Sequence, residues 1–175
     1  MIKGNIVITG FMGSGKTTVA IALARLLGCA ALDLDEMIKE REHRSPREII
    51  EQDSEDRFRE IETHLLAQLL TDSPVCVVAL GGGTWTIAHN RTLLAEHGSL
   101  TVWLDAPFDL CWKRIETSGQ LRPLAPSYET ARKRYQERLD VYGLADHRVP
   151  ISESESAEEI ASKITALISR DGRKN

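Results

Sequence analysis

Short apolar runs recur along the chain and predict the strands of a sheet. The run at 75–80 is apolar at every position, which is typical of a strand that is buried on both faces. The run at 6–8 is also apolar and leads directly into a glycine-rich turn. Together with other short runs, these predict strands at 6–8, 30–32, 75–80, 100–104 and 148–151.

The segments between these runs have helical patterns. Ser45, Pro46 and Glu48 form the sequence signature of a capping box at a helix N-terminus. Apolar spacings of three and four, together with composition, predict helices at 17–27, 36–42, 45–70 with a break near 53–54, 89–96, from 105 onward, 128–141 and 157–169. Because strands and helices alternate, the chain is predicted to be an α/β protein with a parallel sheet and right-handed crossovers.

Length and composition favour one globular domain. Of the 175 residues 42% are apolar and 27% charged, so we expect an ordinary single domain at 1–170 and a frayed tail at 171–175. The net charge of −4 disfavours a general nucleic-acid surface, and no apolar stretch reaches the length of a membrane span. We expect a monomer with no nucleic-acid or membrane partner.

Three cysteines, Cys29, Cys76 and Cys111, lie far apart in the sequence, and two of them have apolar neighbours. An odd number at long spacings favours buried free thiols over a disulfide framework. Free thiols are typical of a reducing compartment, and the N-terminus has no secretion pattern. We therefore expect a cytoplasmic protein.

Residues 10–17 fit the phosphate-binding pattern G-x-x-x-x-G-K-[ST] at every fixed position. Glycines let backbone N–H groups turn toward a polyphosphate, Lys16 can reach the β- and γ-phosphates, and the Thr17 hydroxyl can bind Mg²⁺. The alternative is a Gly/Ser turn with a chance lysine, but a predicted strand precedes the loop and a helix follows it. The predicted nucleotide site comprises Gly13, Ser14, Gly15, Lys16, Thr17 and Thr18.

Two carboxylates and three glycines also follow predicted strands, whose carboxyl ends meet at the edge where ligands bind. Asp33 and Asp35 come after the strand at 30–32, so one carboxylate can hold a water molecule bound to Mg²⁺ and the other can activate a hydroxyl. Either could instead cap the helix that follows. The triple glycine at 81–83 indicates either a close backbone approach to a ligand or a simple turn.

Several arginines lie in charged or loop segments, where a solvated surface is the default interpretation. This applies to Arg57 and Arg59 in one charged stretch, and to most basic residues of the helix that contains Arg138. Arg122 lies in the Gly- and Pro-containing segment 116–127, whose composition is typical of a mobile lid over a nucleotide. As a loop arginine it could equally be exposed to solvent.

Missing motifs narrow the choice of phosphate enzyme. The guanine-binding pattern [NT]-K-x-D of GTPases is absent, and the strand at 75–80 ends in glycine where many ATPases have a carboxylate. The chain is too short for the second domain of a motor or helicase. A small-molecule kinase remains.

An ordered set of motifs resembles the shikimate kinases, small kinases of the nucleoside-monophosphate-kinase-like group, over nearly the whole chain. The phosphate loop is shared by many enzymes, but the ordered set is quite specific. The other blocks are D-x-D at 33–35, F-R-x-x-E at 58–62, L-G-G-G at 80–83, R-P-L at 122–124 and R-x-x-x-Y at 138–142. The resemblance implies a P-loop kinase fold, with a five-stranded parallel sheet flanked by helices, a helical substrate-binding region near 34–62 and a lid near 116–127.

For the nucleotide, the resemblance implies ATP and Mg²⁺. Lys16 and Arg122 would bind the phosphates and take part in catalysis. Thr17 and Asp33 would hold Mg²⁺, the latter through water. Arg114 is left with a stacking role against adenine.

For the acceptor, the resemblance implies phosphorylation of the 3-hydroxyl of shikimate, a step in aromatic amino-acid biosynthesis. Asp35 would hold the hydroxyls of the ring and act as the base, while Arg59 and Arg138 would bind the carboxylate. Further substrate contacts would come from the backbone N–H groups of Gly81, Gly82 and Gly83.

The chain departs from the family pattern at two places. Thr84 and Trp85 follow the glycines where the family generally has smaller residues, and 152–155 lacks the proline that often lies against adenine. Two alternatives stay open: a related kinase for another hydroxylated acid such as gluconate, and a non-catalytic binding module on a kinase fold. The intact Lys16 and Thr17, with both aspartates of the D-x-D block, argue against the second.

Overall fold

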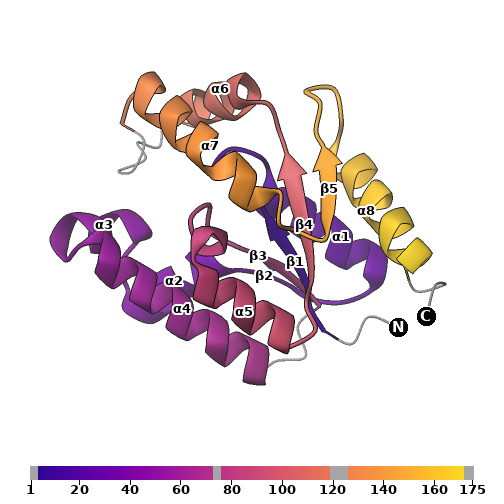
Figure 1. Cartoon of the computed structure of the whole chain (residues 1–175), viewed down its shortest axis with the longest axis horizontal. Coiled ribbons are helices and arrows are strands. Elements are labelled where there is room, and N and C mark those ends of the chain that lie inside the picture. Colours follow the sequence, from indigo (N-terminus) through magenta and orange to yellow (C-terminus); the bar gives the residue numbers. More distant parts are fainter. Residues whose placement is uncertain (1–3, 73–75, 119–125, 172–175) are drawn as a thin grey trace.

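Five parallel strands form one sheet at the centre of the protein, whose computed structural model describes residues 4–72, 76–118 and 126–171 (Figure 1). The strands are β1 (Ile6–Thr9), β2 (Ala31–Asp33), β3 (Val77–Ala79), β4 (Leu100–Asp105) and β5 (His147–Pro150). Their order is β2-β3-β1-β4-β5, and Ile8 pairs with Ala79 on one side and with Val102 on the other. The central strand β1 is buried along its whole length, as its apolar run predicts.

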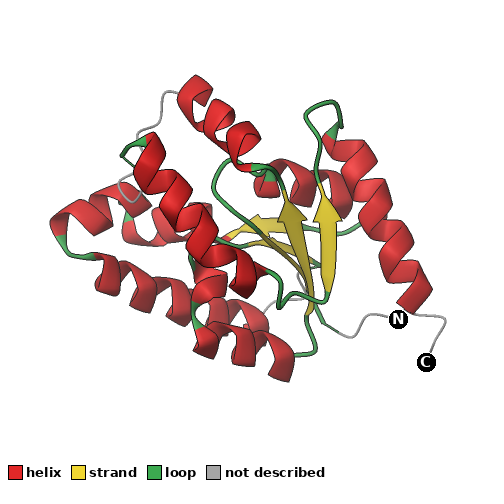
Figure 2. Cartoon of the chain, turned by 45° about the horizontal axis from the view of Figure 1, so that its top comes forward, coloured by secondary structure: helices red, strands yellow, loops and turns green. Residues whose placement is uncertain are grey.

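Helices cover both faces of the sheet (Figures 1 and 2). On one face α1 (Lys16–Leu27) packs against α8 (Ala157–Asp171). The other face is covered by α4 (Glu55–Asp72), α5 (Ala88–Glu96) and α7 (Tyr128–Tyr142). The remaining elements pack around these three helices. Helices α2 (Leu34–Glu42) and α3 (Pro46–Gln52) pack on α4, and α6 (Phe108–Ser118) packs on α7. The 3₁₀ turn η1 (Thr84–Thr86) lies between α4, α5 and α7.

The helix starts follow from local sequence. The capping box at the start of α3 is confirmed, because the Ser45 hydroxyl accepts the Glu48 N–H and the Glu48 carboxylate accepts the Ser45 N–H at 2.7 Å. Ser156 and Glu159 form the same reciprocal pair at the start of α8. Along α8 the buried face contains Ile160, Ile164 and Ile168, one every helical turn.

Several element boundaries differ from the prediction by a few residues. Helix α2 begins two residues early, because Asp33 caps it by accepting the Asp35 N–H at 2.9 Å. Helix α6 continues to Ser118, so the predicted lid loop does not begin at residue 116. The remainder of that loop at 119–125, which includes Arg122, lies outside the described residues. Helix α8 continues to residue 171, and 172–175 of the predicted tail also lie outside.

Cys29 and Cys76 form a disulfide, with their Cα atoms 5.7 Å apart. The prediction of free thiols is wrong for these two residues, while Cys111 is free and buried. The separation of 47 residues hid the pairing, because Cys29 precedes β2 and Cys76 precedes β3, which are neighbours in the sheet. The argument from free thiols for a reducing compartment is thereby removed.

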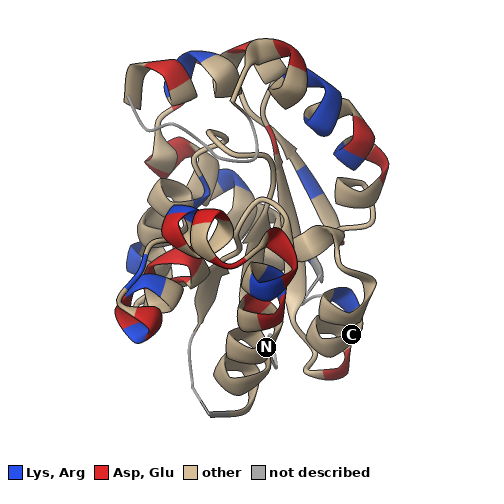
Figure 3. Ribbon diagram, turned by 90° about the vertical axis from the view of Figure 1, so that its left-hand side faces the viewer, with Lys and Arg blue, Asp and Glu red and all other residues tan. Residues whose placement is uncertain are grey.

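Acidic and basic residues are interleaved along the helices drawn in Figure 3, and neither sign gathers on one layer there. Among the described residues, no helix combines the length and the apolar character needed to cross a bilayer.

Candidate active site

The phosphate loop wraps around the N-terminus of α1 in a backbone conformation that needs glycine. Gly13 and Gly15 have φ angles of 78° and 94°, in the left-handed region. A Cβ on Gly13 would also lie 2.5 Å from the carbonyl oxygen of Cys111 on α6. The first turn of α1 contains no acidic residue, so the positive end of the helix dipole is available to an anion.

Side chains from the start of α1 and from the end of β2 meet beside this loop. Lys16 Nζ donates to the carbonyl oxygen of Phe11 at 2.9 Å, which holds the lysine along the loop. Thr17 Oγ1 donates a hydrogen bond to Asp33 Oδ2. Asp33 therefore caps α2 and contacts the phosphate loop at the same time, so the two interpretations of this residue are compatible.

A cavity of about 830 Å³ extends from the phosphate loop to α3, α4 and α7. It contains the glycines and the lysine of the loop at one end and two arginines from different helices, Arg59 and Arg138, at the other. The residues predicted from the sequence that line it are Gly13, Gly15, Lys16, Thr17, Thr18, Asp33, Asp35, Arg59, Gly81, Gly82, Gly83, Arg114 and Arg138. We call the region around Arg59, Glu62, Gly82 and Arg138 the acid end of this cavity.

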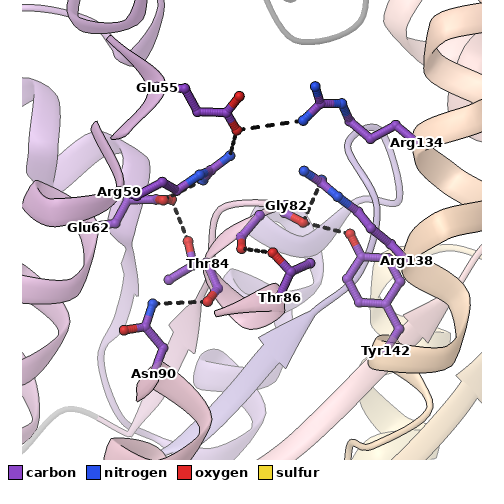
Figure 4. Close-up of polar contacts among 11 residues, drawn as sticks. Glu55, Arg59, Glu62, Gly82, Thr84, Thr86, Asn90, Arg134, Arg138 and Tyr142 are labelled. Carbon is purple, nitrogen blue, oxygen red and sulfur yellow. Dashed lines mark hydrogen bonds and ion pairs between the residues drawn. The ribbon is translucent and has the colours of Figure 1, made fainter. Parts of the chain in front are cut away.

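At the acid end, Arg59 lies between two carboxylates of its own helix. Its NH2 group donates to Glu55 Oε1 at 3.0 Å and its NH1 group donates to Glu62 Oε2 (Figure 4). Burial disfavours the charged guanidinium, but Glu62 and Glu55 outweigh it and raise the pKa of Arg59. The guanidinium is thus held charged and fixed in place.

Glu62 is completely buried and is held from the opposite side by Thr84, whose hydroxyl donates to Glu62 Oε1. Burial raises the pKa of Glu62, against the opposing effect of Arg59 and of the Thr84 hydrogen bond. Asn90 Nδ2 in turn donates to the Thr84 carbonyl at 3.0 Å (Figure 4). The glutamate, the threonine and the asparagine form a continuous polar network beneath Arg59.

Arg138 and Tyr142 converge on one carbonyl group of the glycine block. Their side chains lie on one face of α7, four residues apart, and donate to the Gly82 carbonyl oxygen at 2.9 and 2.6 Å (Figure 4). Burial raises the pKa of Tyr142 to about 12, so the phenol stays protonated as a donor. Burial lowers the pKa of Arg138, and the nearby Arg134 and Arg59 add to this effect.

The triple glycine fits between these groups because it has no side chains. A Cβ on Gly81 would lie 2.6 Å from Glu62 Oε1 and 2.8 Å from Asp35 Oδ1. A Cβ on Gly83 would overlap the guanidinium of Arg59. The glycines therefore allow the backbone to lie directly against the carboxylates and arginines of the cavity.

Known proteins with these motifs share both sequence and fold with this chain. A model of the shikimate kinase family matches residues 12–169. The shikimate kinase of Cereibacter sphaeroides is 40% identical over 166 residues, which cover 93% of this chain and 81% of that protein. The chain belongs to the shikimate kinase family.

Solved structures agree with the family assignment. Shikimate kinase from Acinetobacter baumannii, solved in complex with shikimate, matches with a TM-score of 0.88 and 32% identity over 96% of this chain and 94% of that one. The predicted P-loop kinase fold is confirmed. A gluconokinase from Sinorhizobium meliloti matches at a TM-score of 0.66 with 20% identity, over 99% of this chain and 95% of that one, which shows a shared fold alone.

In this member of the shikimate kinase family, two predicted site residues are not among the described residues of the cavity wall. Ser14 is buried at 1% exposure beneath the loop, and its N–H donates to the Phe11 carbonyl at 3.1 Å. Arg122 lies outside the described residues. Arg114 lines the cavity and donates to the Gly13 carbonyl at 3.2 Å, beside the phosphate loop.

The default surface interpretation is correct for Arg57 and wrong for Arg59. The side chain of Arg57 is 56% exposed and pairs with Glu60, whereas that of Arg59 is 17% exposed. The acid end also contains residues to which sequence reasoning gave no role, namely Glu55, Glu62, Thr84 and Arg134. The sequence did indicate a contact with Arg59 for two of them, since Glu55 and Glu62 lie four and three residues from Arg59, on the same face of a helix.

Proposed function

We propose that the protein transfers the γ-phosphoryl group of ATP to the 3-hydroxyl of shikimate, giving ADP and shikimate 3-phosphate. The observation that carries this proposal is one cavity with two dissimilar ends. A phosphate loop lies at one end, and at the other two partly or wholly buried arginines, Arg59 and Arg138, come from separate helices. Such a cavity suits a small acceptor that carries both a hydroxyl and a carboxylate.

The nucleotide end suits ATP with Mg²⁺. Lys16 and the backbone N–H groups of the loop would bind the β- and γ-phosphates, and Arg114 would lie against the base. The paired oxygens of Thr17 and Asp33 suit a hard cation, and no group of three or more acidic, His or Cys side chains that could hold a metal occurs among the described residues. This fits Mg²⁺, which takes most of its ligands from water and phosphate and neutralises phosphate charge when bound.

At the acceptor end, Asp35 in the first turn of α2 lies between the phosphate loop and the glycine block. We propose that Asp35 accepts the proton of the 3-hydroxyl. As the hydroxyl oxygen forms its bond to the γ-phosphorus, the bond from that phosphorus to the ADP oxygen breaks. Arg59 and Arg138 would hold the carboxylate, and the backbone at Gly81, Gly82 and Gly83 would approach the ring. The region near 34–62 thereby becomes the substrate-binding part of one kinase domain.

We infer further that the protein acts as a monomer in the cytoplasm, where ATP is supplied. Residues of a single chain make up both ends of the cavity, which supports a site that is complete in one copy. Light scattering at assay concentration tests the first statement, and a dimer mass there would contradict it.

The test of the reaction is a coupled ADP-release assay with shikimate, gluconate and AMP as separate acceptors. We expect turnover with shikimate that exceeds the other two by at least about a hundredfold. AMP lacks the carboxylate, whose charged hydrogen bonds are worth about 1.5–3 kcal/mol each, and gluconate is an open chain that does not hold its carboxylate and its hydroxyls in the fixed geometry of a ring. Preference for gluconate would assign the chain to a related kinase. Tight ATP binding without turnover of any acceptor would make it a binding module.

A further inference from the structure

A second ion pair lies beside the acid end of the cavity and links its two helices. Glu55 Oε1 on α4 accepts from Arg59 and lies 3.6 Å from Arg134 NH1 on α7 (Figure 4). Arg134 precedes Arg138 by one helical turn, so both arginines project from the same side of α7. The side chains of Glu55 and Arg134 are 39% and 27% exposed, and neither residue is among those that line the cavity.

The charges at the acid end pair off in a definite way. Arg59 contacts two carboxylates, Glu55 and Glu62, so its single positive charge does not balance their two negative charges. Arg134 supplies the second cation for these two carboxylates. Arg138 donates to the neutral Gly82 carbonyl, so its positive charge has no carboxylate partner among these contacts.

An incoming carboxylate changes this balance. It would be the third anion within reach of Arg59, and like charges at short range repel each other. With Arg134 present, its positive charge balances the negative charge of Glu55, and the positive charge of Arg138 can pair with the substrate carboxylate. Without Arg134, Glu55 would engage Arg59 alone and oppose the entering acid.

We propose that Arg134 is a positioning residue that sets the affinity for the acceptor carboxylate by neutralising Glu55, the partner of Arg59. It acts through Glu55 and Arg59 and does not touch the acid itself. The inference rests on the proposed function, because it requires an acceptor that carries a carboxylate.

The variant Arg134→Met keeps an unbranched apolar side chain in place of the arginine stem and removes the charged guanidinium. We expect the KM and the Kd for shikimate to rise by about three- to fivefold, the upper part of the range for a partly exposed ion pair, while kcat and the KM for ATP stay within about twofold. Arg134→Lys should stay within about twofold of the wild type in all constants, because the required property is the charge. The matched control is Lys133→Met, which removes one charge from the same helix at a side chain that is 81% exposed.

The double variant Glu55→Gln/Arg134→Met separates a charge effect from a merely structural one. Glutamine still accepts a hydrogen bond from Arg59 but is neutral, so the double variant should return the shikimate KM to within about twofold of the wild type. If the ion pair only held α4 against α7, the double variant would be as impaired as Arg134→Met or more so. That result, or a KM for Arg134→Met equal to that of the Lys133→Met control, would overturn the proposal.

The outcomes also separate this inference from the proposed function. Absence of shikimate turnover by the wild-type protein would overturn both. Normal wild-type turnover with no effect of Arg134→Met would overturn the inference alone. If Arg134→Met melts below the assay temperature, Arg134→Gln compared with Arg134→Lys gives the same contrast, and equal KM values for these two variants would equally overturn it.

Discussion

At the phosphate end of the cavity, consecutive residues of one loop form the binding surface, and Gly13 and Gly15 give its backbone the required shape. At the acid end, Arg59 and Arg138 come from α4 and α7, and side chains on α4, η1 and α7 hold them in place. In the proposed function, the first end binds phosphate with backbone N–H groups and one lysine. The second depends on the exact conformation of buried charged side chains, and so on the packing of the whole molecule.

Because of this difference, we expect the two ends to respond differently to sequence change. A loop that binds through its backbone needs a fixed local pattern, and that pattern is visible in eight consecutive residues. The acid end needs carboxylates around Arg59, a hydroxyl at Thr84 and the carbonyl of Gly82 as an acceptor, which are spread between residues 55 and 142. Substitutions at the first end should affect chemistry, and substitutions at the second should affect substrate affinity.

The largest effect is expected at the phosphate end, from Lys16→Ala. The lysine stabilises negative charge that moves onto the phosphate oxygens during transfer, so kcat should fall by about 10³–10⁵-fold. Circular dichroism should show an unchanged fold, because the lysine side chain is only half-buried and lies along the loop. Unchanged kcat in a folded variant would remove the basis for the phosphate end.

The next effect is expected between the two ends, from Asp35→Asn. The amide keeps the size of the side chain but cannot accept the proton of the hydroxyl, so kcat should fall by about 10²–10⁴-fold while the Kd for ATP stays nearly constant. Steady-state assays at saturating substrate give kcat, and nucleotide titration gives the Kd. A kcat within a few-fold of the wild type would leave Asp35 with a positioning role only.

At the acid end, removal of either arginine should act on affinity. Each charged hydrogen bond to the carboxylate is worth about 1.5–3 kcal/mol, so Arg59→Ala or Arg138→Ala should raise the shikimate KM by roughly ten- to a hundred-and-fifty-fold. The KM for ATP should hardly change. Lysine should rescue either position poorly, since a point charge lacks the planar fork of the guanidinium. Parallel changes in both KM values would contradict the separation of the two ends.

The smallest effect is expected from Arg57→Ala, which serves as the matched control for Arg59. Arg57 lies two residues away on the same helix, but its side chain is 56% exposed and pairs with Glu60. An exposed pair of this kind contributes only about 0.2–1 kcal/mol to stability, so the kinetic constants should stay within about twofold. A large rise in the shikimate KM for this variant would show that charge on α4 acts at long range and not by contact.

The sequence predicted the phosphate end almost completely and the acid end only by resemblance. A contiguous loop, a preceding strand and a following helix are local features, and local patterns determine them. Within the charged stretch, a carboxylate three residues further on does not by itself distinguish the buried Arg59 from the exposed Arg57, because both arginines have one. The distinction comes from Glu62 and Thr84, which approach Arg59 only after α4 and η1 have packed together.

The fold itself was predictable, since apolar runs and helical periodicity follow from burial on one or both faces. The Cys29–Cys76 disulfide was not, because the pairing depends on which strands become neighbours, and the order β2-β3-β1 is set by crossovers between distant segments. The double role of Asp33 likewise depends on which segments become neighbours. Asp33 was correctly considered as a cap, but its simultaneous contact with Thr17 requires the phosphate loop to lie beside β2.

The central claim is that the acid end recognises the charge of the acceptor carboxylate through Arg59. It is tested most directly by measuring kcat/KM for shikimate and for its methyl ester with the wild-type protein and with Arg59→Ala. The account predicts that the wild type uses the ester poorly. It also predicts that Arg59→Ala loses about ten- to a hundred-and-fifty-fold on the acid but only a few-fold on the ester. Equal losses on acid and ester would mean that Arg59 maintains the structure and does not bind the substrate, and would contradict the account.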